Sequence, residues 1–512
     1  MVFNSYIFIL VYLPVCVAGW FLINRVNHKA ADWFLIAMGI WFYGCFGFWY
    51  LVVLGVSSLF NYALGCVLEK KRKAKGWLAF GIAMNLLFLG WFKYISPELT
   101  TLAENGSVTW PAGWSAFIAL GLPVGLSFYT FSLISYLVDK YRGELCREPF
   151  REYLLYVTYF PKIIQGPITC YEEVASQFRD RNRRRFDPEG FSRGLGLFIM
   201  GLAKKLLIAD VLSGPASYGI QSAYYLDTLS VITAFSCYAL QLYMDFSGYC
   251  DMSMGISRML NIELPLNFNA PFQAESFPEF WKRWHMTLTR FFTCYVYIPL
   301  GGSRKGSFRT FVNVMVVFVL SGFWHGFGGT YLVWGALSGI LVAMGNVLHK
   351  RRVTQDGRPE TPAPCRQKQH KQTEGSVKSA LCRAGVYLLF LFTLIFFGAP
   401  SLEYSGAILR RFLVFTYPGW LYRMAAKLDM PEFWLLNKLV SAAAPGLADA
   451  VLLAELLGML ALSLLLVNRK RTAVTLSETM ALNVRNAVLL GALLVMCLCS
   501  VSGVSTYLYF QF

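Results

Sequence analysis

The chain alternates long apolar runs with short polar loops, a pattern that predicts a bundle of membrane-crossing helices. A helix needs about 20 residues to cross the hydrocarbon core of a bilayer. The runs that reach or approach this length lie at residues 3–23, 32–48, 51–67, 77–95, 115–137, 194–213, 230–246, 311–327, 331–348, 384–399, 448–467 and 484–511. The predicted fold class is therefore an all-α polytopic membrane protein with 11 or 12 transmembrane helices.

Two of these runs differ from simple spans. The first lacks a basic segment and a small-residue cleavage site, so we interpret it as a retained helix and not as a signal peptide. The run at 194–213 carries Lys204 and Lys205 in its middle, and each charge at that depth costs about 2.5–3.5 kcal/mol on the lenient insertion scale. We expect this run to be buried by protein or partly interfacial.

Proline, glycine and polar residues interrupt the apolar pattern in the middle of the chain, at 159–167 and 241–249. Irregular backbone at membrane depth is tolerated only where protein buries it or where it lines a cavity. The piece from Pro161 to Pro167 is too short to span, so it is predicted to be re-entrant, with a kinked interfacial loop as the alternative. The pattern thus predicts re-entrant and interfacial helices as well as spans.

Composition excludes a soluble enzyme, because 56% of the 512 residues are hydrophobic and only 15% are charged, with a mean hydropathy of +0.48. The net charge of +17 does not indicate a nucleic-acid partner, since the basic residues fall in short loops. Loop 68–76 has five Lys and Arg residues against Glu69, whereas loop 97–114 has two Glu and no basic residue. The first is predicted to be cytoplasmic and the second outside, which puts both termini outside.

Four segments are expected along the chain. Residues 1–137 form N-terminal transmembrane helices, 138–348 a core with re-entrant segments, 349–383 a basic cytoplasmic linker, and 384–512 C-terminal transmembrane helices with an outer loop at 400–447. The linker is rich in Pro, Gln, Lys and Arg and nearly lacks apolar residues, which is typical of a disordered segment.

His325 is the strongest candidate for chemistry. It ends an apolar run that begins near Val312 and carries no charge, and an ionisable group at such depth is a functional candidate by default. Glycines surround it (Gly322, Gly326, Gly328 and Gly329), and they let a substrate or a neighbouring backbone come close. A hydrogen-bonded packing histidine remains the alternative.

His285 is the second candidate, and like His325 it follows a tryptophan. Residues 278–296 are predicted to form one helix with Ser276 as its cap and Pro278 in its first turn. Helical spacing would place Trp281, His285, Leu288 and Phe292 on one face. A histidine on an aromatic face is often a satisfied core residue, and this interpretation also stays open.

An ordered set of motifs resembles the membrane-bound O-acyltransferase (MBOAT) family, in particular its bacterial alginate O-acetyltransferase-like branch. The resemblance covers nearly the whole chain, and its motifs are Met1-Val2-Phe3, residues 122–131, Gln165-Gly166-Pro167, residues 244–252, residues 267–271, residues 280–285, residues 297–302, Trp324-His325-Gly326 and the closing Tyr509-Phe510-Gln511-Phe512. Thr293-Cys294-Tyr295 and Gly398 depart from the pattern of many relatives, which weakens the assignment of a particular polymer. The resemblance implies the family's fold, with a tunnel through a thin central region.

The resemblance also implies that His325 is the essential residue and His285 a second important one. A neutral imidazole can take the proton of a hydroxyl that attacks a thioester, and fixed donors must hold the resulting oxyanion. Candidates for orienting the histidine or contacting the oxyanion or the substrate are Asn269, Asp245, Gln165, Trp324 and Trp284. The sequence shows no metal-site spacing of cysteines, so no metal and no permanently bound cofactor is expected.

By resemblance, the donor is acetyl-CoA or an acyl carrier thioester on the cytoplasmic side of a bacterial inner membrane. The topology suggests that the thioester enters from the His285 side and that the acyl group leaves past His325. The acceptor would be a periplasmic acetyltransferase or acceptor protein and, through it, a polysaccharide or peptidoglycan. Alternatives are D-alanyl or other acyl transfer from a carrier protein, a transporter or flippase, and an idle scaffold; membrane lipids are the remaining expected partner.

Overall fold

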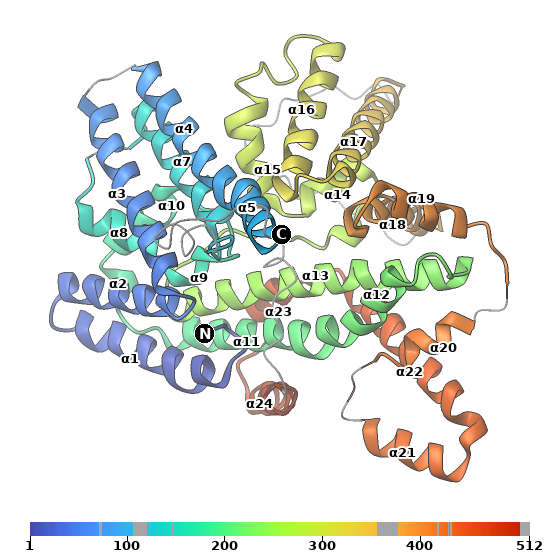
Figure 1. Ribbon diagram of the computed structural model, residues 1–512. Helices are drawn as coiled ribbons and strands as arrows, with labels where there is room; N and C mark the ends of the chain where they lie inside the picture. The colour runs from blue at the N-terminus through green and yellow to red at the C-terminus, as the bar shows by residue number, and fades with distance from the viewer. Residues whose placement is uncertain are drawn as a thin grey trace. The chain divides into compact units, whose positions relative to one another are not determined.

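A computed structural model describes residues 1–70, 74–105, 120–145, 147–355, 377–416, 419–428, 430 and 433–501. Within 147–355, the side chains are described only up to residue 348. Every regular element in these ranges is a helix, and Figure 1 shows how they are arranged. The prediction of an all-α multi-pass membrane protein is confirmed. The closing residues 502–512 and residues 356–376 of the predicted linker lie outside the described residues.

Seven helices of the described chain are long and apolar enough to span a membrane, and each overlaps a predicted span. They are Phe48–Lys70, Lys75–Glu104, Thr228–Met259, Ser307–His325, Gly329–Leu348, Val377–Gly398 and Pro445–Val467. The runs at 3–23 and 484–511 contain the shorter apolar helices Phe8–Asn24 and Val484–Cys499. Of the other predicted runs, 32–48 overlaps the 17-residue helix His28–Gly44 and 115–137 overlaps the helix Leu126–Arg142, with residues 115–119 outside the described residues. The run at 194–213 is interrupted by the π-helical stretch Lys204–Ala209.

The chain forms two compact units whose segments alternate along the sequence. The first comprises Met1–Leu206, Phe246–Leu266 and Ala473–Gln511, and the second Leu207–Asp245 and Asn267–Thr472. Helix α13 (Thr228–Met259) and the π-helical η4 (Lys204–Ala209) each contribute residues to both units. The four predicted segments were consecutive in the sequence, whereas each compact unit combines stretches that are distant in the sequence.

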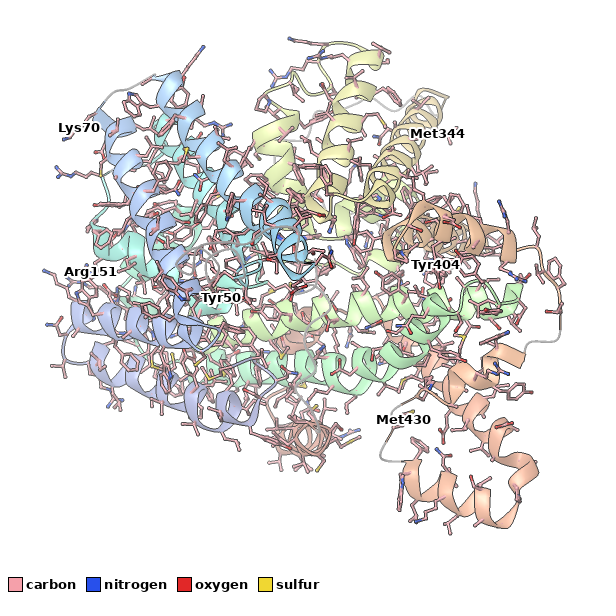
Figure 2. The ribbon with its side chains drawn as sticks, in the orientation of Figure 1. Tyr50, Lys70, Arg151, Met344, Tyr404 and Met430 are labelled. Atoms are coloured by element: carbon pink, nitrogen blue, oxygen red, sulfur yellow. The ribbon has the colours of Figure 1, made fainter. Side chains whose placement is uncertain are left out.

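The first unit packs the N-terminal helices with the broken region after them. Its elements are η1 (Phe8–Tyr12), α1 (Leu13–Asn24), α2 (His28–Gly44), α3 (Phe48–Lys70), α4 (Lys75–Gly90), η2 (Trp91–Ile95), α5 (Ser96–Glu104), α7 (Leu126–Arg142), α8 (Phe150–Thr158), α9 (Phe160–Ile163), α10 (Tyr171–Arg179), η3 (Asn182–Arg184), α11 (Pro188–Ala203), α23 (Ala473–Thr479) and α24 (Val484–Cys499). Figure 2 labels Tyr50 and Lys70 near the two ends of α3.

The predicted re-entrant segment is a single helical turn, α9, followed by a buried turn through Gln165 and Gly166. Gly125 begins α7 with φ +78°, and a Cβ there would lie 2.4 Å from the Ile163 carbonyl oxygen. Glycine is therefore required at this position for both its conformation and its close approach. The motif at residues 122–131 thus contacts the chain directly before the motif Gln165-Gly166-Pro167.

The lysines of the run at 194–213 lie where α11 passes into the π-helical η4. The Lys204 Nζ lies 2.5 Å from Asp251 Oδ2, and the Lys205 residue is 2% exposed. Close packing of Gly201 against the Gly248 backbone brings α11 and α13 together here. A buried charge is tolerated only when it is paired, and Asp251 supplies that partner for Lys204.

The second unit contains both candidate histidines. Its elements are α12 (Asp210–Gln221), α13, η5 (Pro271–Gln273), α14 (Phe277–Arg283), α15 (Met286–Phe292), the π-helical η6 (Thr293–Tyr297), α16 (Ser307–His325), α17 (Gly329–Gln355), α18 (Val377–Gly398), α19 (Leu402–Arg411), α20 (Gly419–Ala425), α21 (Trp434–Ala443) and α22 (Pro445–Val467). Helices α16 and α17 form a tight hairpin. A Cβ on Gly322 would lie 2.3 Å from the Tyr331 carbonyl oxygen, and one on Gly335 would lie 2.5 Å from that of Phe318.

The variant Gly322→Ala is expected to unfold at a lower temperature than the wild type. Its Cβ would meet backbone, which cannot rotate away, and overpacking of this kind costs about 1–3 kcal/mol. The matched control is Gly385→Ala in α18, where nothing lies within 4 Å and alanine is expected to stabilise the helix by about 0.5–1 kcal/mol. Thermal unfolding in detergent compares the two, and equal melting temperatures would contradict the packing described here.

Candidate active site

The backbone turns sharply at His285. Ser276 caps α14 as predicted, with its Oγ accepting from the Glu279 N–H at 3.3 Å. The helix then ends at Arg283, because Trp284 is extended and His285 is left-handed with φ 45° and ψ 52°. The predicted single helix over 278–296 was therefore wrong, and the face shared by Trp281 and His285 does not exist. A left-handed residue other than glycine costs about 1–2 kcal/mol, so neighbouring contacts must hold it.

Asn267 supplies these contacts. Its carbonyl oxygen accepts from the Met286 N–H at 2.8 Å, and its side-chain Oδ1 accepts from the Thr287 N–H at 3.2 Å and the Thr287 hydroxyl at 2.8 Å. The same Oδ1 lies 3.2 Å from His285 Nδ1. Because Oδ1 can only accept, Nδ1 carries the proton in this contact. In the neutral form of this imidazole, Nε2 is then the basic nitrogen.

Sequence reasoning missed Asn267 and selected Asn269 from the same motif. The Asn269 residue is exposed, and its backbone N–H donates to the Arg283 carbonyl at 3.0 Å. Asn269 thus caps the end of α14 through its backbone, whereas Asn267 is 0% exposed and contacts the imidazole. The motif alone could have drawn attention to either asparagine, but only the register of the turn distinguishes them.

The segment that carries His285 runs beside α17. At the start of α14, Pro278 packs against Gly345, where a Cβ would lie 2.6 Å from the proline ring. Further along, the Trp281 ring centroid is 5.7 Å from that of Trp334. The distance from residue 334 to residue 345 along α17 is about 16 Å. The segment 277–297 therefore passes along the helix, turns at His285 and returns.

His325 is the last residue of α16 and is 5% exposed. Three aromatic rings surround the imidazole, with centroids at 4.5 Å for Trp324, 5.2 Å for Trp334 and 4.9 Å for Phe397. The glycines nearby serve the neighbouring helix. A Cβ on Gly326 would lie 2.3 Å from the Tyr331 ring, so a side chain of α17 occupies this space.

Trp324 lies next to both histidines, because its ring centroid is 6.4 Å from that of His285. Trp284, 3% exposed, has its ring centroid 5.2 Å from those of Phe268 and Phe390, and Phe268 also lies beside His285. Asp245 is 1% exposed on α13. The structure thus gathers His285, His325 and Trp324 in one place of the second unit.

Gln165 belongs to the first unit. Its residue is 1% exposed, and its backbone oxygen accepts from Cys250 Sγ at 3.9 Å. Among the described residues, the side-chain amide has no hydrogen-bond partner at either end. A buried polar group left without a partner costs about 1–3 kcal/mol, which makes Gln165 a candidate for contacting a bound molecule. In the described ranges no group of three or more His, Cys, Asp or Glu side chains is arranged to hold a metal ion.

The family that the sequence motifs indicated is also found by comparison with known proteins. Residues 35–355 match the family model of the MBOAT, or membrane-bound O-acyltransferase, family. The chain belongs to this family. As a member it is an acyltransferase, and a transporter or an idle scaffold is not supported. Both histidines lie within the matched residues.

Relatives from bacteria show which branch of the family this chain resembles. The acyltransferase is 34% identical over 374 residues to the peptidoglycan O-acetyltransferase of Helicobacter pylori, covering 67% of this chain and 70% of the relative. It is 33% identical to a probable alginate O-acetylase of Pseudomonas aeruginosa, covering 68% of this chain and 66% of the relative. A teichoic acid D-alanyltransferase of Bacillus subtilis is 25% identical over 44% of this chain. The predicted resemblance to the alginate O-acetyltransferase-like branch is confirmed.

Acid is expected to destabilise the acyltransferase through His285. Burial lowers the pKa of this imidazole to about 3, whereas the unfolded chain has the ordinary value near 6.5. Below pH 6.5 the unfolded state binds a proton that the folded state rejects, so stability falls by about 1.4 kcal/mol per pH unit. Thermal unfolding of the wild type and His285→Gln at pH 5 and pH 7 measures this. The wild type should lose about 2 kcal/mol more than the variant, and parallel losses would reject a neutral buried His285.

Proposed function

We propose that this acyltransferase moves an acetyl group from a cytoplasmic thioester across a bacterial inner membrane for O-acetylation of an envelope polymer such as peptidoglycan or an alginate-like polysaccharide. The donor is acetyl-CoA or an acyl carrier protein, and a periplasmic acetyltransferase or acceptor protein takes part. The names of the relatives support acetyl transfer, since the relatives with higher identity and coverage are O-acetyltransferases. The observation that carries the proposal is the pair of buried histidines on either side of Trp324.

In this mechanism His325 acts as the general base. Its imidazole takes the proton from an acceptor hydroxyl while that oxygen attacks the thioester carbonyl carbon. The tetrahedral intermediate then expels the thiolate, which takes the proton back from the imidazolium, so that an ester and a free thiol result. His325 acts in its neutral form, which can accept this proton. Asn267 fixes the ring of His285, which then directs its Nε2 toward the reacting groups.

The position of His285 relative to α16 bears on where the two histidines act in the proposed reaction. The basic loop with Arg304 and Lys305 precedes α16, and positive-inside topology puts that end of the helix in the cytoplasm. The 19 residues of α16 rise about 28 Å to His325 at the opposite end. His285 reaches the same end at the turn of its segment, and this replaces the expectation that it stays on the cytoplasmic side. The two histidines therefore act in one chamber rather than in sequence.

Removal of His325 is expected to abolish transfer. Inside-out membrane vesicles from cells that express the full chain and its native partner proteins would be supplied with acetyl-CoA labelled in the acetyl group. The readout is alkali-labile label on envelope polymer or on a co-purified periplasmic protein. His325→Ala should lose at least 100-fold in rate, because a positioned general base contributes about 10²–10⁴-fold.

His349→Ala is the matched control, since this histidine is the first residue of the predicted linker 349–383 and has no part in the proposed site. His285→Ala should also lose activity, and Asn267→Ala should lose part of it. Wild-type rates in His325→Ala at equal expression would reject its role as the base. If the label reaches the polymer only from an acyl carrier protein loaded with labelled acetyl, and not from acetyl-CoA, the carrier protein is the donor.

A further inference from the structure

A cavity of about 580 Å³ lies in the first unit, apart from the proposed base. The turn between α1 and α2, the start of α8 and the segment from α10 to η3 enclose it. Its size lies within the usual range of about 300–1,000 Å³ for small-molecule sites. Its lining is dominated by charged side chains, namely Lys29, Asp32, Arg151, Glu152, Arg179, Arg181 and Arg184.

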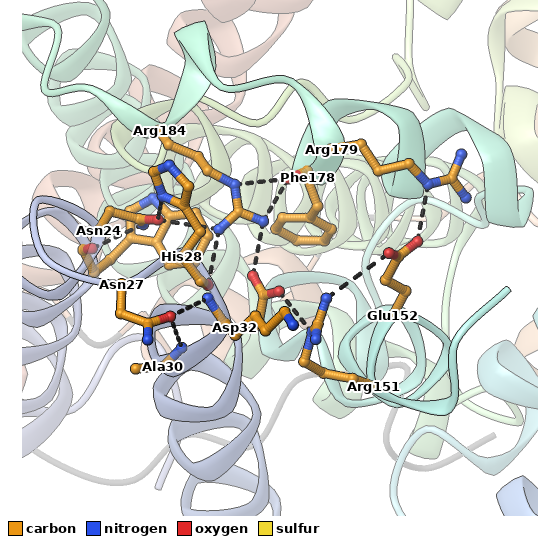
Figure 3. Close-up of polar contacts among 12 residues, drawn as sticks. Asn24, Asn27, His28, Ala30, Asp32, Arg151, Glu152, Phe178, Arg179 and Arg184 are labelled. Atoms are coloured by element: carbon orange, nitrogen blue, oxygen red, sulfur yellow. Dashed lines mark hydrogen bonds and ion pairs between the residues drawn. The ribbon is translucent and has the colours of Figure 1, made fainter.

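Asp32 fixes two arginines on the wall of this cavity. Its Oδ2 accepts from Arg151 Nε at 2.9 Å, and its Oδ1 accepts from Arg184 Nη2 at 2.8 Å. Figure 3 shows both guanidinium groups turned toward this carboxylate. The Asp32 residue is 2% exposed, so its carboxylate acts as a buried support, while Arg151 Nη2 lies 3.9 Å from Glu152 Oε1 and the Arg151 side chain also lines the cavity.

The other arginines differ in what holds them. Arg184 also donates from Nε to the Phe178 carbonyl at 2.8 Å and from Nη1 to the Asn24 side chain at 3.0 Å, which makes it part of the wall. Arg179 donates to Glu152 at 2.8 Å and to Glu172 at 2.9 Å. These contacts hold the guanidinium planes in place before any ligand arrives, and such preorganisation reduces the cost of binding.

Positive charge exceeds negative charge in this cavity. Five basic and two acidic side chains line it, a formal excess of three. Counting Glu172, which contacts Arg179 from outside the lining, still leaves two. In the described part of the chain, the side chains of Lys29 and Arg181 have no ion-pair or hydrogen-bond partner, and both are exposed at the rim. A network of ion pairs that only stabilised the fold would not require these two basic side chains, because they pair with nothing in it.

The start of α2 adds to the positive potential. This helix has 17 residues, and Asn27 caps it by accepting from the Lys29 and Ala30 N–H groups. The amino end of a helix carries a partial positive charge, here directed at the same cavity. On the topology predicted from the basic loops, the turn between α1 and α2 faces the cytoplasm.

We propose that this cavity, which we call the arginine pocket, binds a phosphate-bearing group through Arg151, Arg181 and Lys29. Planar guanidinium groups match the oxygens of phosphate in pairs, and an adjacent ammonium adds a point charge. The group belongs either to a soluble nucleotide-like molecule or to the headgroup of an anionic phospholipid. The assignment does not require the proposed acetyl transfer.

The test uses the full chain in nanodiscs of phosphatidylcholine, with labelled coenzyme A as the soluble probe. Lys29→Gln/Arg181→Gln removes the two rim charges without breaking a wall contact. Lys75→Gln/Arg485→Gln is the matched control, because it removes two exposed charges of the first unit away from the pocket. The rim variant should bind coenzyme A at least tenfold more weakly than the wild type and the control. Unfolding curves of the three proteins confirm that they are equally folded.

A second arm covers the lipid source. The proteins are purified from vesicles of phosphatidylglycerol and phosphatidylcholine in equal amounts, and native mass spectrometry counts the retained lipid. Preferential loss of phosphatidylglycerol from the rim variant would assign the pocket to a headgroup. Equal binding of both probes by wild type and rim variant would overturn the proposal. That result leaves acetyl transfer intact, whereas an inactive enzyme with a working pocket would reject only the proposed function.

Discussion

One amide oxygen, Oδ1 of Asn267, supports the geometry of the second unit at its most unusual point. Without it, the N–H and the hydroxyl of Thr287 would lose their acceptor in an apolar interior, where each unpaired group is costly. With it, the chain can stop α14, pass through a left-handed residue and start α15. That local arrangement sets the position of His285. Because Trp324 lies beside both histidines, it also sets where His285 lies relative to His325. A functional site is thus attached to a helix break that hydrogen bonds stabilise.

The surroundings of the two histidines have a common character. Trp324, Trp334 and Phe397 contact His325, and Phe268 and Trp324 contact His285. Aromatic rings exclude water but offer few strong acceptors, so they favour the uncharged form of an imidazole. An enzyme that hydrolysed its thioester would waste the donor, and a dry enclosure protects a reactive acyl group from water. The same rings therefore serve packing and chemistry.

Hydropathy predicted the spans well, because a bilayer tests composition over many residues and tolerates local detail. It could not predict the break at Trp284 and His285, since residues 278–296 contain no glycine and no internal proline. The partner that causes the break lies 18 residues earlier in the chain. For the same reason Asn269 was selected in place of Asn267. The glycines beside His325 predicted close approach, but only packing could show that Tyr331 makes it.

The arginine pocket went unnoticed because its charges come from separate loops, each of which positive-inside topology already explained.

The hairpin of α16 and α17 limits how this enzyme can diversify. Gly322, Gly326 and Gly335 admit backbone or ring atoms so closely that almost any side chain there would push the two helices apart. The α16–α17 wall beside His325 consequently tolerates few substitutions. Adaptation to a bulkier acyl group or another acceptor must then begin on the facing wall, at positions such as Phe397 in α18, where ring volume can change without moving the base.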